Sequence, residues 1–418
     1  MKAGRGITVL CTLIVVFAWG CIGGAQTLTM VVHWSAGDPM FDTLRAKADL
    51  YQELHPGIEI QILGGHDPVD RQVVVMTAGG VPPDLFHTID YEMASLVGSG
   101  LTAPVPREVS DRMRAFFYPS VLERLEGERG GFFGIPTENM VSAIAIDIPV
   151  FDAHGLAHEV PTWDDLTQVA MKLHAQDAGG NVTRWGAALP LRIDQLLAFL
   201  KSNNATFLDD ENQLRISSVE AQETLEYLRN LATERRIVDA YGLGGSSIPS
   251  GTAALVMSLP WHRYLYLDLP DWLDRIVTAP LPRGPRGTLA TGIYNYLWHV
   301  HAQSAHADAA WQFLVWLTMT PGSNGVTPMG EIMSIVASLP TNQNDLENNP
   351  VYRFEMPWYQ GFITGLTEGQ IAGIKMLPES RELYQRVLQS EARAFILGNQ
   401  SLAQTLSNIE TRAAALLK

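Results

Sequence analysis

Residues 28–62, LTMVVHWSAGDPMFDTLRAKADLYQELHPGIEIQI, decide the fold of this chain. Apolar side chains alternate with others over 28–34 and again over 58–62, which is the period of a β-strand. Between them, the apolar residues of 39–54 recur at helical spacing behind an Asp-Pro pair that favours a helix start. A strand, a helix and a strand in this order favour parallel pairing of the two strands. We therefore expect an α/β protein.

The rest of the chain continues this alternation of strands and helices. Each later helix is predicted from a stripe of apolar residues three or four positions apart. One of them begins with a predicted capping box, formed by Ser217 and Glu220. The predicted helices cover 162–173, 217–232, 306–319, 379–397 and 401–417.

Length and composition narrow the class of protein. The 418 residues are enough for two or three domains, each with its own core. Hydrophobic residues make up 46% of the chain and charged residues 17%, which is typical of a globular protein and excludes intrinsic disorder. The formal charge of 29 − 44 = −15 disfavours binding to nucleic acid or to an anionic membrane surface.

The first 25 residues have the pattern of an export signal. Lys2 and Arg5 precede an apolar run over 7–19, which is shorter than the roughly 20 residues needed to span a bilayer. We therefore predict that 1–25 is a signal peptide and that the protein is exported, either to the periplasm or to the outer face of the cytoplasmic membrane.

Two ways of processing this signal remain open. Cys21 directly follows the apolar run, as at a bacterial lipoprotein junction, and it would carry a lipid anchor. The small residues 23–25 instead suit a signal peptidase that leaves Gln26 as the new amino terminus. We favour the lipid anchor because a Cys at this place has no better explanation. The only other cysteine is Cys11, so the mature chain cannot form an internal disulfide.

A series of local motifs follows in a characteristic order. They are HPGIEIQI at 55–62, PPDLF at 82–86, GSGLTAPV at 98–105, GGFFGIP at 130–136, VFDAHGL at 150–156, PTWDDL at 161–166, SGTAALVMSLPW at 250–261, APLPRGP at 279–285 and HADAAWQFLVWLT at 306–318. In this order, behind an export signal, the sequence resembles the extracellular solute-binding proteins of ABC importers, in the sugar-binding family that includes maltose-binding protein.

The resemblance implies a two-lobed α/β architecture, the type II periplasmic-binding-protein fold, with a ligand cleft between the lobes that closes by hinge bending. It implies a first lobe of 26–142 plus 288–345 and a second lobe of 143–287 plus 346–418. It also implies two partners, a small-molecule sugar and the transmembrane subunits of an ABC permease.

A sugar ring has apolar faces and a rim of hydroxyls, so its site needs flat aromatic rings and side chains that donate and accept hydrogen bonds. Candidates of both kinds lie at predicted strand ends, in loops and where the chain passes from one predicted lobe to the other. The resemblance adds Trp261 and Tyr384 as stacking positions. For each candidate a structural role is the alternative, such as core packing for Trp34 or helix capping for Asp90. The predicted ligand-binding residues are Trp34, Asp90, Tyr91, Glu138, Asn139, Trp261, Tyr294, Trp358 and Tyr384.

Signatures of catalysis and of metal binding are weak. His299, His301 and His306 have no Cys or acidic residue beside them to complete a metal site. The stretch GLGGSS at 242–247 lacks the Lys of a phosphate-binding loop, and no GxSxG motif occurs. We therefore predict a protein without catalytic residues, cofactor or metal.

Three functions follow from this reading. The leading hypothesis is a binding protein of an ABC importer that captures a carbohydrate by hinge closure. The second keeps the binding role but takes a polyol, a glycerol phosphodiester or another polar solute. The third is an exported glycoside hydrolase, which would need two carboxylates facing each other across the cleft.

Overall fold

The computed structural model describes residues 26–127, 130–242 and 244–417. The predicted signal peptide 1–25, with Cys11 and Cys21, lies outside the described residues. Within the described ranges, no helix combines the length and the apolar character needed to cross a membrane.

The unit predicted from 28–62 is confirmed. Strand β1 (Gln26–Val31) pairs in parallel with β2 (Ile58–Leu63), with Leu28 opposite Ile60. Helix α1 (Pro39–Leu54) connects them and buries the stripe Phe41, Leu44, Ala48 and Tyr51. Burial of this stripe drives the helix onto the sheet, because each such apolar side chain contributes about 1.5–3 kcal/mol when it leaves water.

This unit forms one edge of a seven-stranded sheet with the order β13-β4-β12-β3-β1-β2, in which β14 also pairs with β12. We call the part of the protein built on this sheet the first lobe. Its other strands are β3 (Leu85–Ile89), β4 (Ile135–Val141), β12 (Ala290–Val300), β13 (Leu339–Pro340) and β14 (Gln370–Ala372). Its helices are α2 (Val69–Ala78), α3 (Asp90–Gly98), α4 (Arg107–Phe116), α5 (Pro119–Leu125), α11 (Ala307–Met319), α12 (Pro328–Val336) and α13 (Gln343–Asn348).

A second sheet has five strands in the order β11-β5-β10-β8-β9, and we call the part built on it the second lobe. Its strands are β5 (Ala143–Asp147), β8 (Ala187–Ala188), β9 (Val238–Asp239), β10 (Leu255–Ser258) and β11 (Ile276–Ala279), beside a separate β6 (Ala175–Gln176) and β7 (Val182–Arg184) pair. The remaining α-helices are α6 (Ile148–Ala153), α7 (Trp163–Leu173), α8 (Ile193–Ser202), α9 (Val219–Arg229), α10 (Trp272–Arg275), α14 (Pro350–Phe354), α15 (Met356–Glu368), α16 (Ser390–Ile396) and α17 (Leu402–Leu416).

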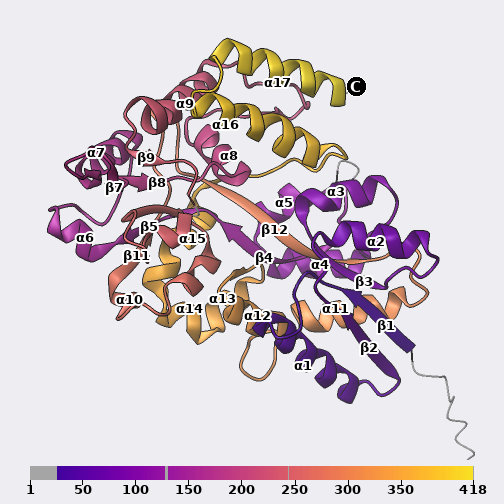
Figure 1. Ribbon diagram of the computed structural model, residues 1–418. Coiled ribbons are helices and arrows are strands. Elements are labelled where there is room, and N and C mark those ends of the chain that lie inside the picture. Colours follow the sequence, from indigo (N-terminus) through magenta and orange to yellow (C-terminus); the bar gives the residue numbers. More distant parts are fainter. Residues whose placement is uncertain (1–25, 128–129, 243, 418) are drawn as a thin grey trace, which may run out of the picture.

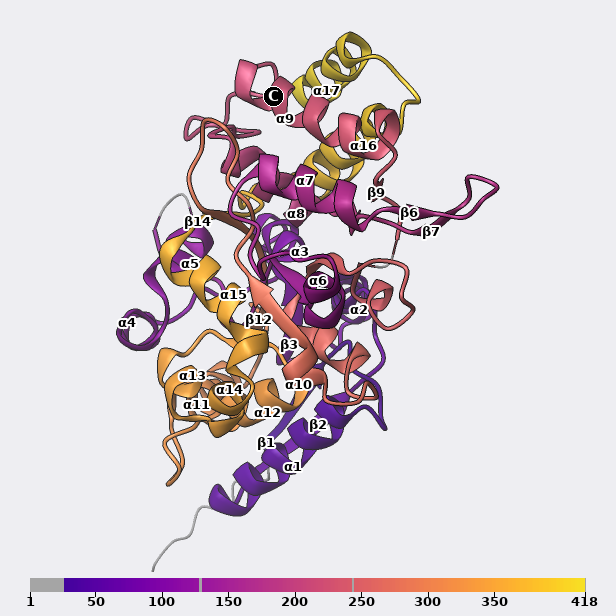
Figure 2. The ribbon, with the colours of Figure 1, turned by 90° about the vertical axis from the view of Figure 1, so that its left-hand side faces the viewer.

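The two lobes lie end to end, with α9, α16 and α17 at one end and α1, β1 and β2 at the other (Figure 1, Figure 2). The chain passes from the first sheet to the second at Ser142, between β4 and β5, and returns through the long strand β12. The predicted α/β class and two-lobed fold are confirmed. The exact lobe boundaries at 142/143, 287/288 and 345/346 stay a prediction.

Each lobe has its own apolar core, and a third cluster joins them. This junction cluster takes Leu297 from β12, Ala145 from β5, Val256 from β10 and Trp358 from α15. Because it draws on both sheets, it holds the lobes together independently of any ligand.

One predicted helix cap is displaced by a residue. The structure places the N-cap of α9 at Ser218, whose side chain accepts a hydrogen bond from the backbone N–H of Ala221. The hydroxyl of Ser217 instead donates to Glu410 on α17, 2.5 Å away, so the expected capping box of Ser217 with Glu220 is wrong.

Gly292, on β12, allows a test of how closely α8 packs against the strand that returns the chain to the first lobe. A Cβ atom built on it would lie 2.1 Å from the backbone oxygen of Asp194 on α8, closer than any non-bonded contact allows. We expect Gly292→Ala to lower the free energy of unfolding by about 1–3 kcal/mol, the usual cost of overpacking, measured by urea denaturation.

The control is Gly79→Ala, where the nearest atom to the new Cβ is at 3.4 Å and the backbone is right-handed. Its effect should stay within about 0.5 kcal/mol. Equal effects of the two substitutions would show that the close approach at Gly292 is relieved at no cost.

Candidate functional site

A cavity of about 160 Å³ lies where the two lobes meet. Tyr91 enters it from the start of α3, and Tyr294 enters it from β12. The opposite wall comes from the start of α8 and from the segment Arg381–Gln389. The lining residues are Tyr91, Arg192, Ile193, Asp194, Ile293, Tyr294, Ile374, Gln385 and Gln389.

The charged pair in this cavity is anchored to the crossing between the lobes. The Nε of Arg192 lies 3.1 Å from Oδ1 of Asp194, and its guanidinium group lies 5.4 Å from the ring centroid of Tyr294. The other oxygen of Asp194 accepts a hydrogen bond from the hydroxyl of Ser142 at 3.2 Å. Only 3% of the Asp194 side chain is exposed, so its charge is held in place by these partners.

Both phenols in the cavity stay un-ionised at neutral pH. Burial is the main cause that raises the pKa of Tyr91, to about 12, and burial also raises the pKa of Tyr294 strongly. Each hydroxyl therefore both donates and accepts hydrogen bonds, and the amides of Gln385 and Gln389 do the same. Flat rings beside groups of this kind suit a ligand that has apolar faces and a rim of hydroxyls.

A row of stacked rings runs from the cavity into the first lobe. Tyr294 meets Tyr296 edge to face, and Tyr296 stacks on His33 with ring centroids 4.7 Å apart. His87 continues the row behind His33. Burial lowers the pKa of His33 to about 4, so its ring is neutral at physiological pH. Its Nδ1 has no hydrogen-bond partner among the described residues.

The structure brings Tyr91 and Tyr294 together in the cavity, and it places Trp34 and Trp261 nearby but outside its lining. Trp34 is 4% exposed and packs against His87 in the first-lobe core. Trp261 follows β10 on a short helical turn and is half-buried, with its ring edge-to-face against His262. Its contact with a ligand stays a prediction.

Asp90 and Asn139 belong to a buried hydrogen-bond network in the first lobe, in which Oδ2 of Asp90 makes the contacts and its Oδ1 has no partner among the described residues. Asp90 accepts hydrogen bonds from Arg124 at 2.8 Å and from the backbone N–H of Asn295 at 2.9 Å. The side chain of Asn295 donates to Asn139 at 2.7 Å, and Asn139 donates to the carbonyl of Pro340. These bonds tie α3, α5, β12, β4 and β13 together, so we leave Asp90 and Asn139 out of the proposed site.

Trp358 and Tyr384 present no ring face to the cavity in this conformation. Trp358 is fully buried in the junction cluster and donates its indole N–H to the carbonyl of Pro260 at 3.1 Å. Tyr384 is 2% exposed and packs edge to face on Phe207 in the second-lobe core. We leave both out of the proposed site.

Glu138 is buried without a cationic partner. It lies on β4 with its Oε2 accepting a hydrogen bond from Ser338 at 2.7 Å. Burial raises its pKa to about 7, against which the Ser338 bond acts only weakly. Glu138 is therefore divided between the neutral and charged forms near physiological pH.

Sequence reasoning did not select Arg192, Asp194, Gln385 or Gln389 as ligand contacts. These residues lie on the first turn of α8 and on a helical segment near the chain end. A polar side chain at such a place is usually solvated. Gln385 and Gln389 could have been found in the sequence, because they are two polar residues one helical turn apart and Gln385 directly follows Tyr384.

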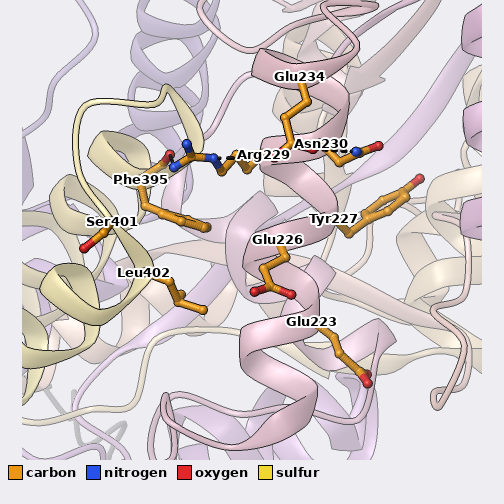
Figure 3. Close-up of a pocket in the computed structure, with 9 residues that line it drawn as sticks. All are labelled: Glu223, Glu226, Tyr227, Arg229, Asn230, Glu234, Phe395, Ser401 and Leu402. Atoms are coloured by element: carbon orange, nitrogen blue, oxygen red, sulfur yellow. Dashed lines mark hydrogen bonds and ion pairs between the residues drawn. The ribbon is translucent and has the colours of Figure 1, made fainter.

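A larger groove of about 670 Å³ lies on the second lobe between α9 and the α16–α17 pair (Figure 3). Its lining comes from this one lobe, and Arg229 spans it by donating to the carbonyls of Phe395 and Gln400. Closure of the lobes would leave such a groove unchanged, so we do not assign the solute site to it. Within the described ranges no group of three or more His, Cys, Asp or Glu residues could hold a metal ion.

The fold and the interlobe cavity define a two-lobed binding protein. The family model of bacterial extracellular solute-binding proteins matches residues 37–322. The chain therefore belongs to this family. Its members are solute-binding proteins and not enzymes, which agrees with the weak catalytic signatures of the sequence.

Characterised relatives are distant. The chain is 23% identical over 261 residues to the arabinooligosaccharide-binding protein of Bacillus subtilis, covering 59% of this chain and 58% of the relative. It is 22% identical to the maltotriose-binding protein of Pyrococcus abyssi, covering 77% and 69%. Among solved structures, the ABC substrate-binding protein of Listeria monocytogenes in complex with cycloalternan matches with a TM-score of 0.75 at 16% identity, covering 94% of this chain and 98% of that one.

Glu138 gives a pH-dependent prediction. Its folded-state pKa of about 7 lies above the ordinary value of 4.5, so the wild type loses stability as the pH rises between these values. Glu138→Gln removes this loss. Relative to the wild type, we expect the variant to gain about 3 kcal/mol of unfolding free energy between pH 4.5 and pH 8.

The measurement is urea denaturation of both proteins at several pH values without sugar. Glu368→Gln, at an exposed position of α15, is the matched control and should follow the wild type throughout. A difference between Glu138→Gln and wild type that is constant with pH would contradict the assignment.

Proposed function

We propose that this protein captures a carbohydrate outside the cytoplasm and delivers it to the permease of an ABC importer. The observation that carries the proposal is the interlobe cavity, with two un-ionised tyrosines, the Arg192–Asp194 pair and two glutamine amides. Family membership supports solute binding, and relatives named for arabinooligosaccharide and maltotriose binding support the ligand class.

Closure follows from contacts that only the closed form makes. A ligand in the cavity touches Tyr91 and Tyr294 of the first lobe and Arg192 and Gln385 of the second at the same time. A shift from mostly open to mostly closed requires about 5 kcal/mol of differential affinity. A hydrogen bond to the charged Arg192–Asp194 pair contributes about 1.5–3 kcal/mol and one to a neutral phenol or amide about 0.5–1.5 kcal/mol, so about three to five new contacts are sufficient.

A phosphate-bearing solute is the weaker alternative. A phosphate needs free cationic donors, and the guanidinium group of Arg192 is already paired with Asp194. Arg263, which follows Trp261 by two residues, is likewise paired, with Glu355. A neutral polyol remains compatible with the same lining and is distinguished from a sugar by direct titration.

The test is calorimetric and tryptophan-fluorescence titration of the mature protein with mono- and oligosaccharides, polyols and glycerol phosphodiesters. We expect saturable binding of at least one sugar. Tyr294→Ala should weaken that binding by about 1–3 kcal/mol, because the ring contributes a central contact.

Two variants accompany Tyr294→Ala. Tyr294→Phe keeps the ring and should retain most of the stacking energy, whereas Phe354→Ala changes a 76% exposed ring on α14 and should bind as the wild type does. Binding of a polyol or phosphodiester with no response to any sugar would overturn the ligand class.

We further propose that the mature protein lies in the periplasm or on the outer face of the cytoplasmic membrane, held by a lipid on Cys21. The apolar run followed directly by a Cys supports the anchor. Mass spectrometry of the membrane fraction should find an amino terminus at Cys21 carrying acyl chains. A soluble form that begins at Gln26 would contradict the anchor and leave the binding function intact.

A further inference from the structure

One arginine of the second lobe reaches two acidic residues of the first. Arg381 begins the helical segment Arg381–Gln389. Its Nη1 lies 3.0 Å from Oδ2 of Asp70 on α2, and its Nη2 lies 3.0 Å from Oε1 of Glu92 on α3. We call these two contacts the Arg381 bridge.

The two ends of the Arg381 bridge are fixed to different cores. Leu383 and Val387, on the same segment as Arg381, are buried in the second-lobe core. Val69 and Val73 of α2 are buried against strands β1 and β3 of the first lobe. The charged side chains therefore move with separate lobes. A hinge movement that draws these two elements apart must break the Arg381 bridge.

The Arg381 bridge combines one ion pair with one hydrogen bond to a neutral acid. Burial is the main cause that raises the pKa of Glu92 to about 8, and the carboxylates of Asp70 and Asp67 add to this rise, whereas Arg381 acts against it. At pH 7 the Glu92 side chain is therefore mostly protonated, and its Oε1 accepts a hydrogen bond from Arg381. Asp70, which is 16% exposed, supplies the charge opposite the guanidinium group. An ion pair shielded to this extent is screened less than one on the open surface.

The Arg381 bridge acts on elements that line the interlobe cavity. The guanidinium group of Arg381 lies 5.7 Å from the ring centroid of Tyr91, which belongs to the lining. Gln385, one helical turn after Arg381, lines the same cavity from the second lobe. While the Arg381 bridge is intact, α3 and the segment Arg381–Gln389 stay close together, and these two lining residues are held near each other.

We propose that the Arg381 bridge is a latch that favours the closed arrangement of the lobes before any ligand is bound. Such a latch raises the closed population of the free protein, so that a ligand has to supply less of the closing free energy itself. This inference goes beyond carbohydrate capture, because it concerns the protein without ligand and holds for any class of solute.

The experiment is small-angle X-ray scattering of the mature protein at pH 7 without ligand. Arg381→Ala should lower the ratio of closed to open molecules about threefold to tenfold, which raises the mean radius of gyration. Asp70→Asn removes the charge opposite Arg381 and should shift the radius in the same direction. Glu92→Gln should have a smaller effect, because an amide replaces an acid that is already mostly neutral and still accepts the hydrogen bond.

The matched control is Arg386→Ala on the same segment. The guanidinium group of Arg386 lies 3.4 Å from Glu382 within the segment, and its side chain is 69% exposed. This contact stays inside one lobe. The control should therefore keep the wild-type radius of gyration.

A charge exchange separates the latch from a folding defect. Asp70→Arg and Arg381→Asp each replace attraction by repulsion and should increase the radius, whereas the double variant restores opposite charges and should return toward the wild-type value. Urea denaturation of every variant verifies that it is folded. Equal radii for the wild type, Arg381→Ala and Asp70→Asn, all folded, would overturn the latch. That result would leave the carbohydrate proposal intact, because the sugar titration tests it separately.

Discussion

The close approach of α8 to the crossing strands is the constraint on which the structure depends. Gly292 on β12 has no side chain, so the backbone of Asp194 can come against it. The Asp194 carboxylate then reaches Ser142, where the chain passes between the sheets. The hydroxyl of Thr291 donates to the carbonyl of Ser142 at 2.7 Å and closes this arrangement. The lobes therefore meet through hydrogen bonds of fixed direction, and the start of α8 faces the cavity.

Desolvation explains why the buried charges are mostly paired with each other, whereas the groups that line the cavity are mostly neutral. Asp90 and Arg124 form a buried pair in the first lobe, and Asp90 also accepts a hydrogen bond from the backbone of Asn295, whereas Oδ1 of Asp90 and Nε of Arg124 have no partner among the described residues. A buried charge without a partner costs several kcal/mol, so each of these two charges stabilises the other inside the first lobe. Around the cavity the main groups are instead neutral phenols and amides, with one charged pair. Neutral groups lose less hydration when a ligand displaces water, and they still give directional hydrogen bonds.

The sequence predicted the framework well and selected two of the residues that line the interlobe cavity. The alternation over 28–34 and 58–62 identified β1 and β2 because a strand buried on a sheet leaves a period of two in the sequence. Tyr91 and Tyr294 were selected because ligands bind at strand ends and chain crossings in open α/β folds; both line the interlobe cavity, and their contact with a ligand stays a prediction. Trp358 lies in the junction cluster, which the sequence could not indicate because an aromatic residue has the same appearance there whether its ring faces a cleft or a core. Gln385 was missed because the polar face of a helix becomes a cavity wall only once another lobe covers it.

The segment from β14 to Arg381 links these features in space. Ile374 lines the interlobe cavity on one side and a groove of about 760 Å³ on the other. The first lobe holds this segment through Arg124, whose side chain packs against Gly373, and the second lobe holds it through Lys375, which donates to Asn212 at 3.1 Å. A movement of either lobe must therefore pull on the backbone between 373 and 375. Since Ile374 lies in that interval and lines the cavity, the segment that connects the lobes is itself part of the cavity wall.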